Sequence, residues 1–509
     1  MKTTMMRLKS LRRSIRRVGC NLGPAWIASI SLAADEPYVN WIKSPRGSSV
    51  GTFHFLTSDA AGGVIAWDWE GGLVHLNAQG GTISSNLPVG SAVVVTDVDR
   101  AGNQYWTGRV YDNVTFSFPQ VRGGFVAKVG PAGQFAWIRT NEELELSDGD
   151  YRQWTYTTYD GVKADKTGSV VVAGTSKGPF KLQSLEWDGE KGPFVVKLDA
   201  GGKVLWGHKM ACQANDPNLS SSYGVPTLDP AGKSFVSGWL SAGSAEFGDI
   251  TVYPAEHYPR GDYFVAKYTP EGQLLWVKLG YGVSLAVGRQ SEVYTVFTRF
   301  DSDPREVGLA RLSSDGAVLW EKPLQLNGWE FQVALDPLGQ PIIAGGFSGT
   351  LRLDDMTLRS RTADFNDFFV AKMDTNGHTL WAITGGGARG DSVQDLVCDA
   401  EGAIFIGGDY DTSATFDGWS IRATFPTTYG IPFIAKISEE PPLALNHTDH
   451  GIQLAWPAKA TNWVLEATSA LGTPAWAPGN LSSTVSGRDR TATVDTAAMT
   501  SRFYRLRKP

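Results

Sequence analysis

The sequence predicts an all-β fold, and three observations support this prediction. A hairpin-like stretch recurs along the chain, an Asp-x-x-Gly turn between apolar runs precedes most of its copies, and no segment after the N-terminus keeps a helical hydrophobic period. The 509 residues include 58 glycines and 18 tryptophans, a composition typical of many short strands joined by turns. The length suits one large repeat domain with an appendage.

The recurring hairpin has a constant internal spacing. A basic residue lies five positions before a glycine, and a tryptophan follows that glycine at a fixed offset. Alternating apolar residues predict two strands, and the glycine provides the positive φ that the turn between them requires. The five copies are Gly124–Trp137, Pro193–Trp206, Asp262–Trp276, Val307–Trp320 and Phe368–Trp381.

The upstream Asp-x-x-Gly unit predicts a second turn in each repeat. An aspartate three residues before a turn glycine accepts hydrogen bonds from the turn backbone, so a structural role is expected for Asp99, Asp165, Asp229, Asp336 and Asp399. Calcium ligation is the weaker alternative, because each turn offers a single carboxylate and a calcium loop needs several.

The two units together give four antiparallel strands, a to d, which is the content of one β-propeller blade. This template predicts a seven-bladed β-propeller over residues 35–438. The first blade is degenerate, with His75, Gly80 and Ser84 at the basic, glycine and tryptophan positions. The blades cover residues 52–88, 90–140, 155–210, 222–280, 281–325, 327–387 and 390–438, and the fifth has Gly288–Ser291 in place of Asp-x-x-Gly.

The last blade has no strand d of its own. Its strand c, Pro432–Ser438, leads directly into Glu439 without a glycine turn or a tryptophan-bearing strand. The segment Tyr38–Ser44 near the N-terminus resembles the missing strand. We therefore expect this N-terminal strand to close the propeller, with Trp41 at the strand-d tryptophan position.

Residues 1–34 are expected to be an export signal. They carry only positive charges, followed by an uncharged stretch from Val18 to Ala34. A short membrane anchor is the alternative, which the glycine and proline within the stretch disfavour. No later run is long and apolar enough to span a bilayer, so we predict an exported protein in the extracellular space, at the cell surface or in the periplasm.

The charge of the chain excludes some classes of binding partner, and its cysteine content leaves the question of a disulfide open. Removing residues 1–34 takes away seven of the 46 basic residues and none of the 52 acidic ones, so the net charge becomes −13. This acidic balance argues against nucleic acid and anionic membrane surfaces as partners. Cys212 and Cys398 then remain, and the sequence leaves open whether they pair or stay as thiols.

The C-terminal part is predicted to be a separate module. Residues 439–442, Glu-Glu-Pro-Pro, read as a stiff linker, and residues 443–509 alternate as the strands of a small β-sandwich. Between strands b and c of several blades lie extra hairpins that we expect to lengthen one face of the propeller: Ala245–Val252, Leu351–Leu358 and Ala414–Ile421. That loop face is the expected recognition surface.

The FVAK-x-x-x-x-G-x-x-LW hairpin, with its Asp-x-x-Gly turns, resembles the bacterial β-propeller repeat called the SBBP repeat, over roughly residues 38–438. This resemblance implies a secreted or cell-surface bacterial protein, and it carries over no catalytic residues. The pattern from Leu454 to Leu506 is similar to fibronectin type III-like modules of exported bacterial proteins. The turn Leu198–Trp206 also resembles the tryptophan-docking repeat of quinoprotein propellers, but the chain lacks their adjacent cysteines, which favours blade-to-blade packing.

No residue group in the sequence is assigned as catalytic, cofactor-binding or metal-binding. Two Arg-Gly-Asp tripeptides are attributed to chance on the repeat background, the pair His447 and His450 to an exposed polar turn, and the acidic run from Glu142 to Asp150 to solvated charge. The carboxylates Asp354, Asp355, Asp409 and Asp411 lie in turn-rich loops. No hydrolase elbow, phosphate loop or zinc-spaced motif is present in the sequence.

The sequence therefore predicts a non-enzymatic exported binding or scaffold protein, a monomer that engages a glycan or protein on its propeller loops without a cofactor. Two alternatives stay open. One is an extracellular polysaccharide-acting enzyme with its site on the central propeller face. The other is a passive cell-surface repeat protein.

Overall fold

The computed structural model describes the chain in many short ranges, and every regular element in them is a β-strand. The chain divides into two compact units, Met1–Ala34 and Asp35–Pro509. The predicted export signal, residues 1–34, lies outside the described residues. These are 36–44, 53–68, 73–84, 91–110, 123–143, 156–187, 192–214, 222–224, 226–241, 243–254, 261–299, 306–324, 331–423, 430–448, 451–469, 476–494 and 503–508.

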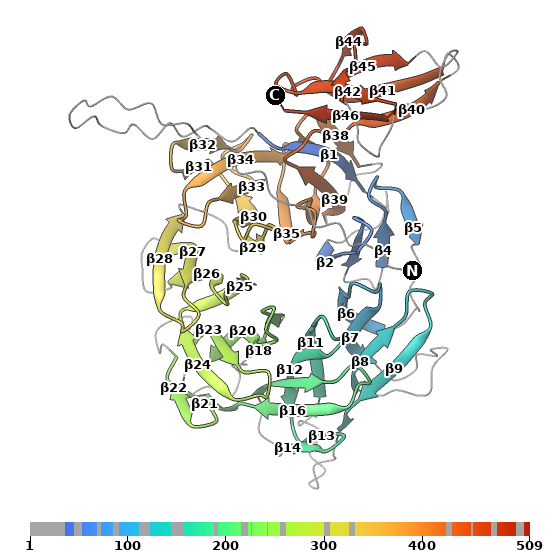
Figure 1. Ribbon diagram of the computed structural model, residues 1–509. Helices are drawn as coiled ribbons and strands as arrows, with labels where there is room; N and C mark the ends of the chain where they lie inside the picture. Colours follow the sequence, from blue (N-terminus) through green and yellow to red (C-terminus); the bar gives the residue numbers. More distant parts are fainter. Residues whose placement is uncertain are drawn as a thin grey trace, which may run out of the picture. The chain divides into compact units, whose positions relative to one another are not determined.

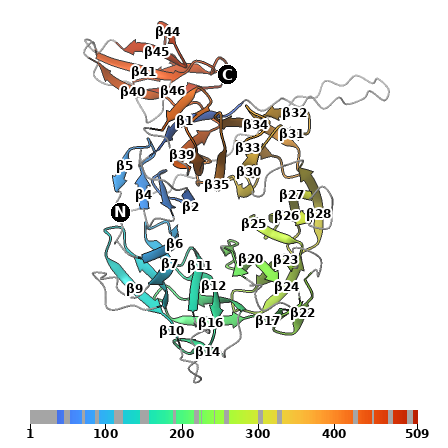
Figure 2. The same ribbon diagram turned by 180° about the vertical axis from the view of Figure 1, so that it is seen from behind.

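The second unit is built from antiparallel sheets in which four strands follow one another in chain order, as in a β-propeller. The first two sheets are β2 to β5 (Phe53–Ser58, Val64–Asp68, Leu73–Leu76, Thr82–Ser84) and β6 to β9 (Ser91–Val98, Gln104–Val110, Gly123–Val129, Phe135–Thr140). The third contains β11, β12, β15 and β16 (Tyr156–Ala164, Val170–Lys177, Gly192–Leu198, Val204–Lys209). Figures 1 and 2 show the first strand of each sheet innermost and the fourth outermost.

The later sheets repeat this order. In one, the short strands β18 and β19 (Ser222–Tyr223, Thr227–Leu228) both pair with β20 (Ser234–Ser241), followed by β23 and β24 (Gly261–Tyr268, Leu274–Leu279). The next contains β25 to β28 (Tyr281–Val287, Val293–Arg299, Glu306–Leu312, Val318–Leu324). The one after it contains β29, β30, β33 and β34 (Phe331–Leu335, Pro341–Phe347, Asp367–Met373, Thr379–Gly386).

One sheet combines strands from distant parts of the chain. Strands β35, β36 and β39 (Asp391–Cys398, Ile404–Tyr410, Ile431–Ser438) are joined by β1 (Tyr38–Lys43), which pairs antiparallel with β39. Trp41 lies opposite Lys436, just as Trp276 of β24 lies opposite Lys267 of β23. The blue β1 and the brown β39 lie side by side in Figure 1.

The predicted hairpin Asp262–Trp276 corresponds to β23 and β24. Its turn glycine, Gly272, has φ +92°, and a Cβ there would lie 2.7 Å from the Trp206 ring of the preceding sheet. The Trp206 indole N–H donates a hydrogen bond to the Pro270 carbonyl in the same turn, at 2.9 Å. The glycine therefore serves both the turn geometry and the close approach of the neighbouring tryptophan.

The Asp-x-x-Gly turns have the geometry expected of structural aspartates. In each, one carboxylate oxygen accepts backbone N–H groups two and four residues later, as Asp336 does from Leu338 and Gln340. The same pattern occurs at Asp59, Asp99, Asp165, Asp229 and Asp399. No group of three or more potential ligands that could hold a metal occurs among the described residues.

The extra hairpins between strands b and c pack against the sheets along one side, which the sequence did not indicate. They are β13 and β14 (Phe180–Leu182, Leu185–Trp187), β21 and β22 (Gly243–Phe247, Ile250–Val252), β31 and β32 (Thr350–Leu353, Met356–Arg359), and β37 and β38 (Ser413–Phe416, Trp419–Arg422). In β31, Leu351 and Leu353 are fully buried. The turn residue Asp354 accepts a hydrogen bond from the Thr379 backbone at the start of strand β34. These hairpins lie over the outer strands, and their apolar side chains fill the joints between sheets.

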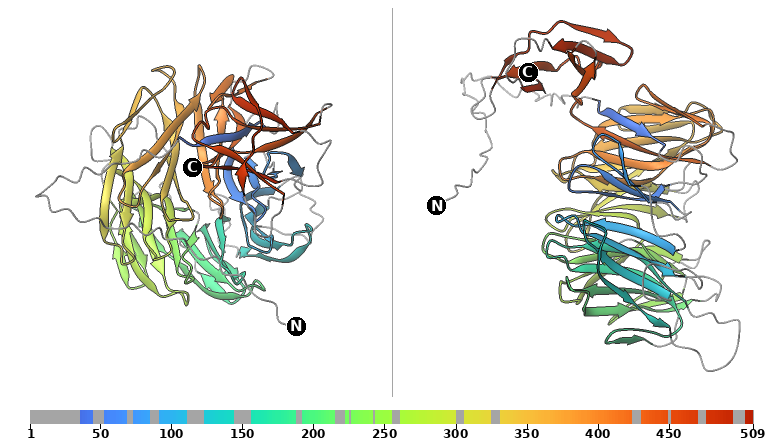
Figure 3. Two further views of the ribbon diagram at one scale, coloured as in Figure 1. Left: turned by 45° about the horizontal axis from the view of Figure 1, so that its top comes forward. Right: turned by 90° about the vertical axis from the view of Figure 1, so that its right-hand side faces the viewer.

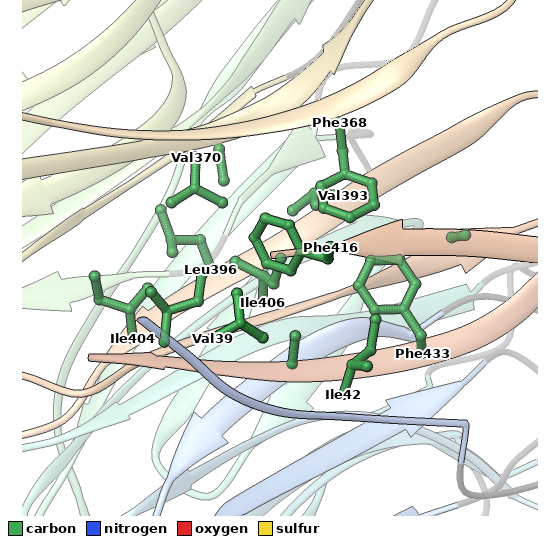
Figure 4. Close-up of a cluster of buried hydrophobic side chains, with 14 of the residues drawn as sticks. Val39, Ile42, Phe368, Val370, Val393, Leu396, Ile404, Ile406, Phe416 and Phe433 are labelled. Atoms are coloured by element: carbon green, nitrogen blue, oxygen red, sulfur yellow. The ribbon is translucent and has the colours of Figure 1, made fainter. Parts of the chain in front are cut away.

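One of these joints is shown in Figure 4. Phe416 of hairpin β37–β38 packs between Phe368 of β33 and residues of the β1-containing sheet, with ring centroids of Phe368 and Phe416 5.0 Å apart. Val39 and Ile42 of β1 belong to the same buried cluster. The strand from the chain start is thus held by side-chain packing as well as by its ladder with β39.

The C-terminal residues form two further sheets. One has the order β40, β41, β45, β44 (Ala444–Thr448, Gly451–Pro457, Asp489–Val494, Ser483–Ser486), and the other β43, β42, β46 (Ala477–Pro478, Val464–Thr468, Phe503–Arg507). Figure 3 shows them in red. Leu454, Trp456, Ala492 and Val494 are buried in a shared core. Below we call residues 443–508 the C-terminal module.

Candidate functional site

A cavity of about 590 Å³ lies among the innermost strands of the propeller sheets. Its lining draws on the first strand of every propeller sheet, including Thr57, Asp97, Lys163, Thr227, Ser284, Gln332 and Asp395. We call it the central cavity. Its size is in the range of small-ligand sites, and hydroxyl, amide and charged side chains share its wall with leucines and valines.

The polar lining arises because several inner strands are irregular. The ladders of β2, β6, β11 and β35 each shift register once, as between Val393 and Asp395. A bulge of this kind re-aims the side chains beside it and disturbs the strict alternation of buried and exposed positions. Polar residues can therefore face the axis from strands whose other residues are apolar and buried.

Polar side chains of one inner strand also hold the next inner strand. The Ala164 N–H donates to Asp97 Oδ2 at 2.7 Å, the Leu56 N–H to Asp395 Oδ2 at 2.6 Å, and the Val333 N–H to Ser284 Oγ at 3.1 Å. Two of these bonds join consecutive sheets, and the bond between Leu56 and Asp395 joins the first sheet to the last. The cavity wall is therefore fixed by hydrogen bonds between sheets, which favours a preformed site.

The described lining contains three charged side chains, those of Asp97, Lys163 and Asp395. Asp97 is buried and pairs with Lys163, whose Nζ lies 2.7 Å from Asp97 Oδ1. Asp395 has no cationic partner among the described residues. Burial raises the pKa of Asp395 to about 7, although hydrogen bonds from the Leu56 and Leu396 amides act in the opposite direction. The residue as a whole is half-buried and belongs to the lining of the cavity.

Chemically, the described part of the cavity offers hydrogen-bond donors and acceptors around a rigid wall. Asp97 is committed to Lys163 and to a backbone amide, whereas Asp395 accepts hydrogen bonds from backbone amides alone among the described residues. The arrangement suits recognition of a polar ligand better than a two-carboxylate mechanism, which needs a matched acid and base.

The described carboxylates singled out in the sequence are not part of the described lining of this cavity. Asp354 pairs with Lys322 at 2.6 Å, Asp411 contacts Arg389 at 3.3 Å, and Asp409 accepts a hydrogen bond from Ser392. Asp391, the acidic residue of the second Arg-Gly-Asp tripeptide, is only 2% exposed and cannot present itself to a receptor. Arg260 of the first tripeptide lies outside the described residues.

Among the remaining groups, Cys398 belongs to the described lining of the central cavity, and His447, Glu142, Glu143 and Cys212 do not. His447 is exposed on β40, and His450 lies outside the described residues. Glu142 and Glu143 form the short strand β10, which pairs with β13, and Glu145, Asp148 and Asp150 lie outside the described residues. Cys212 and Cys398 are not joined to each other by a disulfide.

Sequence reasoning missed Asp97, Lys163 and Asp395 as cavity residues. The available signal was a charged residue inside an otherwise apolar run just before an Asp-x-x-Gly turn, as in Val93–Val98 and Val393–Val397. A charge in such a run is costly to bury unless it has a specific partner or faces a polar space.

Sheet order, inner-strand lining and tryptophan docking define a β-propeller with a polar central cavity. No family model and no curated protein matches the chain. Among solved structures, it is similar to BamB from Moraxella catarrhalis, with 9% identity over 76% of this chain and 85% of that one, at a TM-score of 0.38. It is also similar to the Dos1 propeller, with 8% identity over 79% and 94% of the two chains, at a TM-score of 0.39.

A puromycin hydrolase variant, S511A complexed with PGG, matches at 11% identity over 81% of this chain and 59% of that one, with a TM-score of 0.43. Likeness at these scores carries no functional argument, so the propeller description rests on the strand pairing above. No helix in the described ranges is long and apolar enough to cross a membrane.

Proposed function

We propose that the protein is an exported binding or scaffold protein whose propeller engages a glycan in the central cavity. The observation that carries the proposal is the lining itself, in which each propeller sheet contributes its first strand and polar side chains converge on one space. Hydroxyl and amide groups such as those of Thr57, Gln332 and Gln394 complement the hydroxyls of a sugar. A sugar carries many uncharged hydrogen-bond donors and acceptors, and it can therefore bind to a cavity wall that has few charged side chains.

The proposal includes a complete architecture. Residues 35–438 form seven blades of the SBBP type in a ring closed by β1, residues 1–34 are the cleaved export signal, and residues 439–442 link the propeller to a fibronectin type III-like β-sandwich at 443–509. The mature chain is a monomer outside the cytoplasm, at the cell surface, in the periplasm or released. The pairing of β1 with β39 and the recurrence of the hairpin support this arrangement.

The test is a binding screen with the purified chain. Thermal shift and calorimetry against soluble polysaccharides are expected to give a ligand whose affinity falls about tenfold or more in the double variant Gln332→Ala, Gln394→Ala. Gln290→Ala, in an exposed turn, is the matched control and should bind as the parent does. A ligand whose affinity is equal in both variants binds elsewhere and contradicts the cavity assignment.

A second function, an extracellular polysaccharide-acting enzyme, is favoured by one observation. The pKa of Asp395, about 7, suits proton transfer near neutral pH. Release of reducing ends from a bound polysaccharide, abolished by Asp395→Asn while binding persists, would establish it. Binding without turnover supports the scaffold function, and silence across the whole panel favours the passive cell-surface repeat protein.

A further inference from the structure

The C-terminal module contains its own cavity, separate from the propeller. It has a volume of about 360 Å³ and lies between the two sheets of the module. Trp456, Ser483 and Arg490 line it from the sheet of β41, β44 and β45, and Val464, Leu465 and Pro478 line it from the other. We call it the module cavity.

The module cavity is partly open to solvent, so it is a recess between the sheets that a ligand could enter. Its volume is within the range of small-ligand sites. Its walls include the cores of the two sheets, so a ligand there would complete the hydrophobic packing.

The aromatic side chains of the lining favour a ligand with a flat ring. Two indoles, Trp456 and Trp463, contribute to the wall together with the aliphatic side chains of Leu465 and Leu481. Trp456 is buried as part of the module core. Aromatic walls gain most from stacked or edge-on contacts with another ring.

The polar atoms of the lining favour an anionic acceptor. The Trp463 indole N–H is buried and has no hydrogen-bond partner among the described residues. A buried donor left in this state is costly, and an acceptor atom on a ligand would satisfy it. The Arg490 guanidinium donates to Ser483 Oγ at 3.2 Å, and no carboxylate is among the described residues of the lining.

We propose that the module cavity binds a small aromatic carboxylate, with its ring against the two indoles and its carboxylate toward Arg490 and the Trp463 N–H. Arginine and a carboxylate form charge-assisted hydrogen bonds that a neutral ligand lacks. The site is independent of the central cavity and of any glycan bound there.

Calorimetry of the full chain with 2-naphthoate tests the proposal, and naphthalene-2-carboxamide is the neutral probe of the same size. We expect one naphthoate per chain, with an affinity about tenfold or more above that of the carboxamide. Arg490→Gln should remove this preference and leave the carboxamide affinity unchanged. Arg422→Gln, an exposed arginine on β38, is the matched control and should bind both probes as the parent does.

A second variant and a spectroscopic measurement on the parent chain distinguish loss of the site from misfolding of a variant. Leu481→Trp places an indole ring in the cavity and should abolish binding of both probes. The thermal unfolding midpoint of this variant is measured first, to show that it is folded. The Trp463 indole N–H signal in a ¹⁵N-correlated spectrum should shift on addition of naphthoate to the parent chain. Absence of naphthoate binding at millimolar concentration, equal affinity for both probes, or binding unaffected by Arg490→Gln would each overturn the proposal.

Discussion

Two joints between neighbouring sheets use the same tryptophan position but different acceptors. At the joint between β16 and the β23–β24 turn, the Trp206 indole N–H donates to the Pro270 carbonyl at 2.9 Å. At the joint between β34 and the last sheet, the Trp381 indole N–H donates to Glu439 Oε1 at 2.8 Å. The last sheet takes its outer strand from the chain start, so its strand c is followed by Glu439 in place of a glycine turn.

The basic residues of strand c differ in the same way. Lys197 donates to the carbonyls of Gly232 and Pro270, at 3.4 and 3.3 Å. Lys372 instead forms ion pairs with Asp336 at 2.9 Å and Glu439 at 2.7 Å. Burial alone would lower the pKa of Lys372, but hydrogen bonds to Glu439 and Asp336 raise it above its ordinary value. At the joint formed by Trp206 and Lys197, the hydrogen-bond acceptors are therefore neutral carbonyls. At the joint formed by Trp381 and Lys372, beside the β1-containing sheet, they are carboxylates.

The largest expected effect is the loss of the tryptophan itself. Trp381 is 1% exposed, whereas Trp206 is half-buried. Trp381→Ala should lower the free energy of unfolding by about 3 to 5 kcal/mol, and Trp206→Ala by roughly half of that. Urea unfolding curves measure both. Equal losses would show that burial does not set the contribution of this residue.

Alanine substitutions at two turn glycines distinguish the cost of a steric clash from the cost of a positive φ. Gly272→Ala combines the strain of φ +92° with a Cβ 2.7 Å from the Trp206 ring, and a cost of roughly 2 to 4 kcal/mol is expected. Gly339, at φ +80°, has no atom within 4 Å of its would-be Cβ. Gly339→Ala should therefore cost only about 1 to 2 kcal/mol. Similar thermal unfolding midpoints for the two variants would refute the close-approach role of Gly272.

The last sheet should also carry a distinctive pH dependence. Burial, with smaller contributions from Asp367 and Asp409, raises the pKa of Asp391 to about 7. Because the unfolded value is about 4, the folded state binds this proton more tightly, so its stabilising contribution is complete below about pH 4 and is lost as the pH rises to 7. Asp391→Asn should remove at least about 1 kcal/mol of that decline.

The matched control for this titration is Asp355→Asn, an exposed aspartate in the β31–β32 turn. It should leave the parent's pH profile of unfolding unchanged between pH 4 and 8. A parent profile that Asp391→Asn does not alter would show that Asp391 titrates normally.

The smallest expected effect is at the charged acceptor. Glu439→Gln keeps an acceptor for the Trp381 N–H but removes one charge from Lys372, which retains Asp336. Glu439 is partly exposed, so about 1 kcal/mol is expected, and this difference should shrink at high salt. Glu440→Gln, next in sequence and exposed, is the control. A loss that does not depend on salt would argue against the ionic description of this joint.

The sequence predicted the hairpins well because their signals are local. Alternation, a turn glycine and a tryptophan in the second strand lie within fifteen residues, and β23 and the first half of β24 correspond to that stretch. Even the fifth sheet, which lacks Asp-x-x-Gly, keeps its turn, because Ser291 adopts φ +63° in place of the glycine. The side chain of Ser291 also bonds Asp229 of the preceding sheet, a contact that no local pattern indicates.

The central cavity and the extra hairpins were harder to foresee for a physical reason. Whether Asp395 faces the axis depends on a bulge in β35, and bulges leave little trace in a single sequence. The hairpin β31–β32 alternates as any exposed hairpin would, but its apolar side is buried against residues distant in the chain, such as Tyr294 and Phe369. Tertiary packing, and not local propensity, decides both placements.

The strand β1 has a consequence for the order of folding. Ser44, directly after β1, donates to the Pro432 carbonyl across 388 positions of the chain, and the whole β1–β39 ladder has a similar sequence separation. Contacts this remote are entropically the most costly to form, and they cannot form until synthesis has passed residue 438. We expect the other sheets to form while β1 is still unpaired. The pairing of β1 with β39 should then be the slow final phase of refolding.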